Sequence, residues 1–181
     1  MSMTILELIK KRRVLLDGGF GTELIQRGFP QGACPETWNV ERPEVVKEIH
    51  KSYFEAGSDA VLTNSFGGSA IKLASHGQDK RCYELNRAAA IIANEVKPEG
   101  GFVGGSIGPT GKFLQPQGEF TEPEFEESFA EQARGLADGK VDFLLIETQY
   151  DLREALCALR AARKVAAVPV FVTMTYNRVP R

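Results

Sequence analysis

The chain has 181 residues, of which 43% are hydrophobic and 25% are charged, and its formal net charge is -2. This is the composition of a globular protein with one sizeable core. It provides no basic surface for nucleic acid or an anionic membrane, and no uninterrupted apolar stretch of about 18 residues that would span a bilayer. Cys34, Cys82 and Cys157 form no CxxC pair, which indicates free thiols in a reducing cytoplasm.

In chain order, an amphipathic helix at the N-terminus leads into short apolar runs that alternate with helical patterns. The runs predict strands over residues 14–16, 60–63, 102–105, 143–147 and 168–174. The patterns between them predict helices over residues 43–56, 83–96, 122–137 and 152–165. This alternation is typical of an α/β domain with parallel strands. No linker divides the chain, so residues 1–181 are expected to form one domain.

Polar residues and glycines follow each predicted strand. These segments are Asp17-Gly18-Gly19, Thr63-Asn64-Ser65-Phe66-Gly67, Gly105-Ser106-Ile107-Gly108-Pro109-Thr110-Gly111, Glu147-Thr148-Gln149 and Thr173-Met174-Thr175. In an open doubly wound sheet and in a (β/α)8 barrel alike, ligands bind at the C-terminal ends of parallel strands. An open sheet concentrates its chemistry at one crevice, whereas polar groups at every strand end favour a closed ring around a central site.

The predicted barrel is incomplete. A (β/α)8 barrel takes about 250 residues. The present sequence has 181 residues and five predicted strands. We therefore expect a (β/α)8 TIM barrel truncated to about its first five units, with the C-terminal strands missing.

Asp17 and Glu147 are the strongest candidate site residues. Asp17 ends a strand beside three glycines, Gly18, Gly19 and Gly21. It either braces this turn, as aspartate often does, or faces a small ligand that approaches the open backbone. Glu147 directly follows an apolar strand, where a carboxylate must pair with a cation or receive a cationic ligand, because an unpaired buried charge is costly. A functional role is the favoured interpretation for both residues.

The other strand ends contain weaker signals. Asn64 and Ser65 are equally compatible with ligand binding and with bracing of their own loop. The segment GSIGPTG lacks the lysine and the spacing of phosphate-binding loops, so we interpret it as a tight loop that lies close to a ligand. His50 and His76 have no second ligand at metal-binding spacing, so no metal ligand is predicted within the chain.

Consecutive segments of the chain, in order, resemble those of one family. The segments are LLDGGFGTEL, PETWN, RPEVVKEIHKSYFEAGSDAVLTNSFG, GSIGPTG and LLIETQYDLREA. Together they resemble the homocysteine-binding domain of the homocysteine S-methyltransferase family, over the chain from Leu8 to Tyr176. The resemblance implies a (β/α)8 barrel that transfers a methyl group to the sulfur of homocysteine.

The resemblance also implies roles for individual residues. By matching position, the homocysteine site would contain Asp17, Gly18, Gly19, Asn64, Ser65, Ser106 and Glu147. In this assignment Glu147 would bind the amino group of homocysteine, in agreement with the argument from its place after a buried strand.

Members of the family use a Zn²⁺ ion, held by three cysteines, to generate the reactive thiolate. Cys34, Cys82 and Cys157 do not match the positions of those ligands, so the resemblance places the zinc ligands beyond residue 181 and implies that this chain alone is inactive. The methyl donor could be cobalamin on a corrinoid protein or domain, or a sulfonium or quaternary ammonium compound.

Two other functions stay open at this point. The chain could be a corrinoid-linked methyltransferase that acts on another substrate, or a non-catalytic half-barrel that binds an amino acid. A homocysteine titration separates the first alternative from the favoured function, and the zinc content separates both methyltransferases from the half-barrel.

Overall fold

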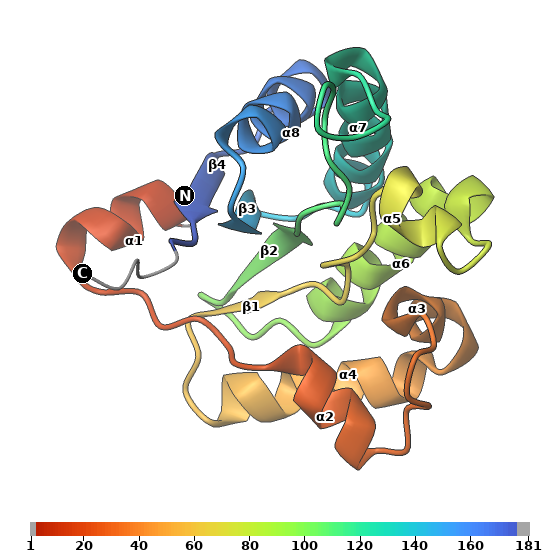
Figure 1. Cartoon of the computed structure of the whole chain (residues 1–181). Helices are drawn as coiled ribbons and strands as arrows, with labels where there is room; N and C mark the ends of the chain where they lie inside the picture. The colour runs from red at the N-terminus through yellow and green to blue at the C-terminus, as the bar shows by residue number, and fades with distance from the viewer. Residues whose placement is uncertain (1–2, 177–181) are drawn as a thin grey trace, which may run out of the picture.

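The computed structural model describes residues 3–176. Its centre is a parallel sheet of four strands in the order β1-β2-β3-β4 (Figure 1). The strands are β1 (Ala60–Leu62), β2 (Phe102–Ile107), β3 (Phe143–Gln149) and β4 (Val170–Met174). Each strand pairs with the next strand of the sequence, which is the order in which a (β/α)8 barrel is built.

Helices connect the strands and flank the sheet (Figure 1). The long ones are α4 (Pro43–Glu55), α6 (Cys82–Glu95), α7 (Glu122–Asp138) and α8 (Leu152–Val165). The short ones are α1 (Ile5–Lys11), α2 (Phe20–Gln26), α3 (Trp38–Glu41) and α5 (Ala70–Ala74), with 3-10 turns η1 (Pro35–Thr37) and η2 (Asp79–Arg81). Within residues 3–176 no helix is both long and apolar enough to cross a membrane.

The two faces of β3 belong to different cores, because neighbouring side chains of a strand point to opposite sides of the sheet. Leu144 and Ile146 pack in the large core formed with the long helices, which contains Phe125 and Phe129 of α7. Phe143 and Leu145 pack on the other face, in a small core that includes Ile5 and Leu8 of α1. Helix α1 therefore covers apolar side chains of the inner face of the sheet.

Capping residues fix where the helices that follow the strands begin. Thr121 forms a reciprocal capping box with Glu124 at the start of α7. Asp151 accepts a hydrogen bond from the Arg153 amide at the start of α8. Such caps satisfy amides that have no partner within the helix and contribute about 0.5–2 kcal/mol each.

The α/β class, the parallel strands and the four long helices predicted from the sequence are confirmed. The prediction of a strand over residues 14–16 is wrong: this segment forms only an isolated parallel bridge between Leu16 and Ala60. It pairs with β1 on one side, no described residue pairs with its other side, and α2 begins at Phe20, three residues after Asp17. The amphipathic helix predicted at the N-terminus is α1. The short helices α2, α3 and α5 were not predicted, because they lie in segments with many polar or glycine residues and show no clear helical period.

Candidate functional site

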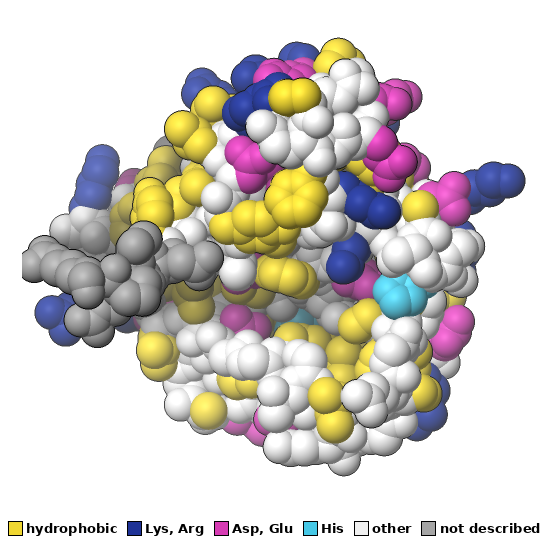
Figure 2. All heavy atoms as spheres, in the orientation of Figure 1, with side chains coloured by type: hydrophobic (Ala, Val, Ile, Leu, Met, Phe, Trp, Pro, Cys, Tyr) yellow, Lys and Arg dark blue, Asp and Glu magenta, His cyan; other side chains and the backbone are white. Residues whose placement is uncertain are grey.

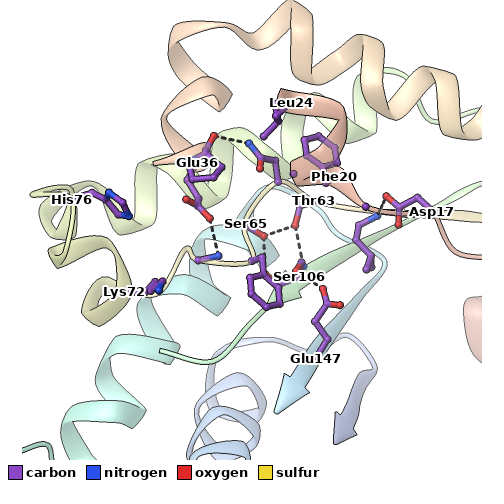
Figure 3. A pocket seen from close by; sticks show the side chains of 18 residues that line it. Asp17, Phe20, Leu24, Glu36, Thr63, Ser65, Lys72, His76, Ser106 and Glu147 are labelled. Atoms are coloured by element: carbon purple, nitrogen blue, oxygen red, sulfur yellow. Dashed lines mark hydrogen bonds between the residues drawn. The ribbon is translucent and has the colours of Figure 1, made fainter. Parts of the chain in front are cut away.

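A cavity of about 390 Å³ opens at the C-terminal ends of β1, β2 and β3. It lies in the hollowed face of the molecule shown in Figure 2, and Figure 3 shows its lining side chains. Its volume is within the range of small-molecule sites, about 300–1,000 Å³. Every site residue predicted from the sequence lines it: Asp17, Gly18, Gly19, Asn64, Ser65, Ser106 and Glu147.

Asp17 is held against the end of β1. Its Oδ2 accepts a hydrogen bond of 2.9 Å from the Leu62 amide, which fixes the carboxylate at the cavity wall. Burial raises the pKa of Asp17 to about 7, and the nearby negative charge of Glu147 adds to the increase, although the Leu62 hydrogen bond opposes it. The group is therefore partly protonated at neutral pH and would ionise fully beside a cation.

Glu147 lies at the end of β3 and joins a chain of hydroxyl groups that crosses the strand ends (Figure 3). The Ser106 hydroxyl donates to Glu147 Oε1 at 2.6 Å, and the Ser106 amide donates to Thr63 Oγ1 at 3.0 Å. The hydroxyls of Thr63 and Ser65 lie 2.6 Å apart. Burial raises the pKa of Glu147, and the bond from Ser106 partly offsets this effect. The network holds the carboxylate while leaving its second oxygen for a ligand.

Gly18 has a packing role that the sequence did not indicate. None of the three glycines after Asp17 has a positive φ, so a left-handed turn is not the reason for them. A Cβ at Gly18 would lie 3.1 Å from the Tyr53 hydroxyl, whereas a Cβ at Gly21 would meet nothing within 4 Å. Gly18 therefore allows Tyr53 of α4 to approach the backbone of the cavity wall.

The side chains of Asn64 and Ser65 are bonded within the protein. Asn64 Nδ2 donates to the Pro35 carbonyl at 2.8 Å and to Asn39 Oδ1 at 3.0 Å. The Ser65 hydroxyl donates to the Ser106 carbonyl at 2.8 Å. These bonds tie the β1 loop to η1 and to β2, so both residues shape the cavity wall. Direct contact of either side chain with a ligand stays a prediction.

The segment GSIGPTG does not present its amides as a phosphate cradle. The buried Glu154 of α8 accepts from both the amide and the hydroxyl of Thr110, at 2.6 and 2.7 Å. Gly111 has a φ of 73°, which allows the tight turn that follows. A carboxylate already occupies the two Thr110 donors of this loop, in agreement with its interpretation as a tight strand-end loop.

Three charged or titratable residues of the cavity were missed by the sequence analysis: Glu36, Lys72 and His76. Glu36 is 4% exposed, and its Oε1 accepts from the Gly67 amide at 2.7 Å. The Cys34 thiol donates to the other oxygen of Glu36 at 3.2 Å, and burial together with this carboxylate raises the pKa of Cys34 to about 12. Glu36 follows no strand, and its only sequence signal is the family-like segment PETWN.

The described residues do not fit the zinc ion that the family resemblance implies. Within residues 3–176 no group of three histidine, cysteine, aspartate or glutamate side chains is arranged to hold a metal. The three cysteines are buried in separate places, and burial raises the pKa of each thiol. His50 is fully buried and packs on Phe20 with a ring distance of 4.9 Å, and burial lowers its pKa to about 3.

Comparison with known proteins defines the class of this chain. Residues 14–180 match the family model described as homocysteine S-methyltransferase. The chain therefore belongs to the homocysteine S-methyltransferase family. It is 33% identical to the methionine synthase of Mycobacterium tuberculosis and 32% identical to that of Mycobacterium leprae, each over 190 residues. These alignments cover 94% of this chain and 16% of each relative, so the chain spans about a sixth of the length of these relatives.

Solved structures of the homocysteine methyltransferase MmuM from Escherichia coli share the fold. The metallated form superposes with a TM-score of 0.79 at 23% identity, over 93% of this chain and 65% of that one. The oxidized form gives 0.78 at 23% identity, over 92% and 63%. These neighbours are TIM barrels, so the predicted fold class is confirmed. The chain spans less than two thirds of their length.

Proposed function

We propose that this cavity binds homocysteine and presents its sulfur to a methyl donor. The observation that carries the proposal is the pair of carboxylates, Asp17 and Glu147, which face one cavity at the strand ends (Figure 3). Neither carboxylate forms an ion pair with a residue in the described range 3–176. The family of the chain and the cavity volume support an amino acid as the occupant.

The ammonium group of homocysteine is the part that these carboxylates would bind. A cation between Asp17 and Glu147 stabilises the ionised form of each and relieves the repulsion between them. The pKa of Asp17 is about 7 in the free protein, so a cation binds more strongly as the pH rises through 7 and Asp17 ionises. The Ser106 hydroxyl keeps Glu147 pointing into the cavity.

The reaction that follows from this binding is a displacement at a methyl carbon. The thiol loses its proton to solvent, the sulfur forms a bond to the methyl carbon, and the bond from that carbon to the donor breaks with its electron pair left on the donor. The role proposed for this chain is to bind and orient the acceptor. Zinc and a corrinoid partner follow from the family resemblance alone.

The three buried free thiols support a reducing cytoplasm as the location.

Calorimetric titration with L-homocysteine tests the proposal. Glu147→Gln keeps the shape of the side chain and removes its charge, and we expect the Kd to rise about tenfold, since a charged hydrogen bond contributes about 1.5–3 kcal/mol. Glu99→Gln, on the exposed surface, is the matched control and should leave the Kd unchanged.

A second ligand shows whether the ammonium is the group that is recognised. The deaminated analogue 4-mercaptobutyrate should bind weakly and with the same Kd to the wild type and to Glu147→Gln. Equal Kd values of homocysteine for the two proteins, with the fold intact by circular dichroism, would remove Glu147 from the site. No binding of homocysteine to the wild type would refute the proposed function.

A further inference from the structure

The two ends of the cavity differ in charge. Asp17 and Glu147 lie at one end, whereas Lys72 and His76 lie at the other, with the side chains of Thr63, Ser65 and Ser106 between (Figure 3). Lys72 belongs to α5, and His76 lies two residues after the end of that helix. Both side chains can donate N–H groups. The outer end also contains Glu36, but its two oxygens accept from the Gly67 amide and the Cys34 thiol, so the free groups of this end are donors.

Lys72 is held in place by buried neighbours at its base. The Ser69 hydroxyl, 1% exposed, accepts from the Lys72 amide at 3.3 Å and caps α5. The next residue, Leu73, is fully buried. Along the side chain, Lys72 Cγ lies 3.4 Å from the Cβ position of Gly67, and Nζ lies 3.4 Å from that of Gly111. The ammonium therefore extends from α5 across the β1 loop to the β2 loop, at the edge of the cavity.

The ammonium of Lys72 has no hydrogen bond or ion pair within residues 3–176. The acidic neighbour beside Gly67 is Glu36, and its two oxygens accept from the Gly67 amide and from the Cys34 thiol instead. Lys72 is partly exposed, and its ammonium has no counter-charge as a partner among the described residues. An anionic ligand group would supply that partner.

The carboxylate of the bound homocysteine is in the wrong place for this role. In an α-amino acid the ammonium and the carboxylate are attached to the same carbon atom. With the ammonium between Asp17 and Glu147, the carboxylate would lie near the inner end, and the side chains of Ser65 and Ser106 lie between that end and Lys72 (Figure 3). The anion at the outer end must therefore belong to a second molecule.

We propose that Lys72 and His76 form a subsite for an anionic oxygen group, a carboxylate or a phosphate, carried by the second substrate. This inference rests on the proposed function, because methyl transfer requires a donor in the same cavity as the acceptor. The subsite would anchor the donor by its anionic group at the outer end, so that the methyl group points inward toward the sulfur.

Titrations of the full chain, saturated with homocysteine, test the subsite. Trimethylglycine and choline both carry a trimethylammonium group, but only trimethylglycine has a carboxylate. Inorganic phosphate tests whether the subsite binds a phosphate group instead. The fluorescence of Trp38, the single tryptophan, reports binding, because it follows η1, whose Pro35 and Glu36 line the cavity. Lys72→Met removes the charge, and Lys72→Arg restores it. Lys112→Met is the control, since Lys112 pairs with Glu119 at 3.8 Å and lies outside this cavity.

We expect Lys72→Met to weaken the binding of either trimethylglycine or phosphate about tenfold, as loss of a charged hydrogen bond predicts. The same substitution should change choline binding less than about twofold. An effect on trimethylglycine alone assigns the subsite to a carboxylate, and an effect on phosphate alone assigns it to a phosphate. Lys72→Arg should retain most of the affinity. Equal losses for trimethylglycine and choline, no change for either anion, or no binding of an anion to the wild type would overturn the inference. If homocysteine still binds in those cases, the proposed function stands without the subsite.

Discussion

The inner and the outer end of the cavity are built differently. The residues of the inner end, Asp17, Ser106 and Glu147, lie on or directly after strand segments that pair with one another. Those of the outer end, Glu36, Lys72 and His76, lie on a 3-10 turn, on a five-residue helix and in the loop after it. Strand pairing fixes the positions of the inner groups. At the outer end, Glu36 is held by hydrogen bonds from the Gly67 amide and the Cys34 thiol, and Lys72 lies against the loops at Gly67 and Gly111.

The largest expected effect concerns the loop that joins the two ends. A Cβ at Gly68 would lie 2.4 Å from Asn86 Oδ1 and 2.9 Å from the Ser65 carbonyl. We expect Gly68→Ala to lower the free energy of unfolding by about 2–3 kcal/mol, because a well-packed site cannot accept an added methyl group. Urea denaturation measures the change.

Gly21→Ala is the control for that substitution. A Cβ at Gly21 meets nothing within 4 Å, and the residue lies in α2, so its change should be neutral or slightly stabilising. Equal stability of the Gly68→Ala variant and the wild type would show that the loop between the two ends is looser than its contacts indicate.

The second effect comes from the inner end, where Asp17 makes the stability of the protein depend on pH. The pKa of Asp17 is about 7 in the folded chain against its ordinary value of 3.8. The folded state thus holds this proton more tightly than the unfolded state, and the stability of the wild type falls as the pH rises from about 4 through 7. Asp17→Asn should therefore raise the free energy of unfolding by about 1–3 kcal/mol at pH 8 and by little at pH 4. It should also weaken homocysteine binding.

Asp59 provides a comparison with Asp17, because its pKa is shifted in the opposite direction. The Arg12 guanidinium and the Leu15 amide lower the pKa of Asp59 to about 2. Its contribution to stability is therefore present above pH 4 and is lost as the pH falls through 2, so Asp59→Asn should destabilise the protein at pH 8. Urea denaturation at pH 4 and pH 8 measures both variants. A stability gain of Asp17→Asn that is the same at the two pH values would contradict the raised pKa of Asp17.

The smallest expected effect concerns a residue that supports both ends. Gln132 of α7 is fully buried, and its Nε2 donates to the Ser65 carbonyl at 2.7 Å. Gln132→Leu leaves that carbonyl without this donor and should cost about 1–2 kcal/mol of folding stability. Homocysteine affinity should also fall by a few fold, because the Ser65 loop would move. Glu127→Leu, on the exposed face of the same helix, should change neither quantity in thermal denaturation and calorimetry. A lower stability with unchanged affinity would limit Gln132 to a structural role.

Local patterns in the sequence were sufficient for the long elements. The predicted helix over 152–165 has the same bounds as α8, because its cap at Asp151 and its apolar period lie within the segment. The segment over residues 14–16 has the same kind of apolar run as the other predicted strands. Whether such a segment forms a strand depends on neighbours on both sides, and it forms a bridge with Ala60 alone.

The sequence by itself determined the α/β class, the parallel direction of the strands and the residues of the inner end. Parallel strands bring their C-terminal ends to one edge, so polar residues that directly follow strands must meet there. Only the tertiary structure decided that Glu36 and Lys72 join them, since each is placed by contacts with distant parts of the chain. It also decided why Gly18 is a glycine, through the approach of Tyr53. Such contacts depend on how helices pack over the loops, and no spacing within a local segment encodes them.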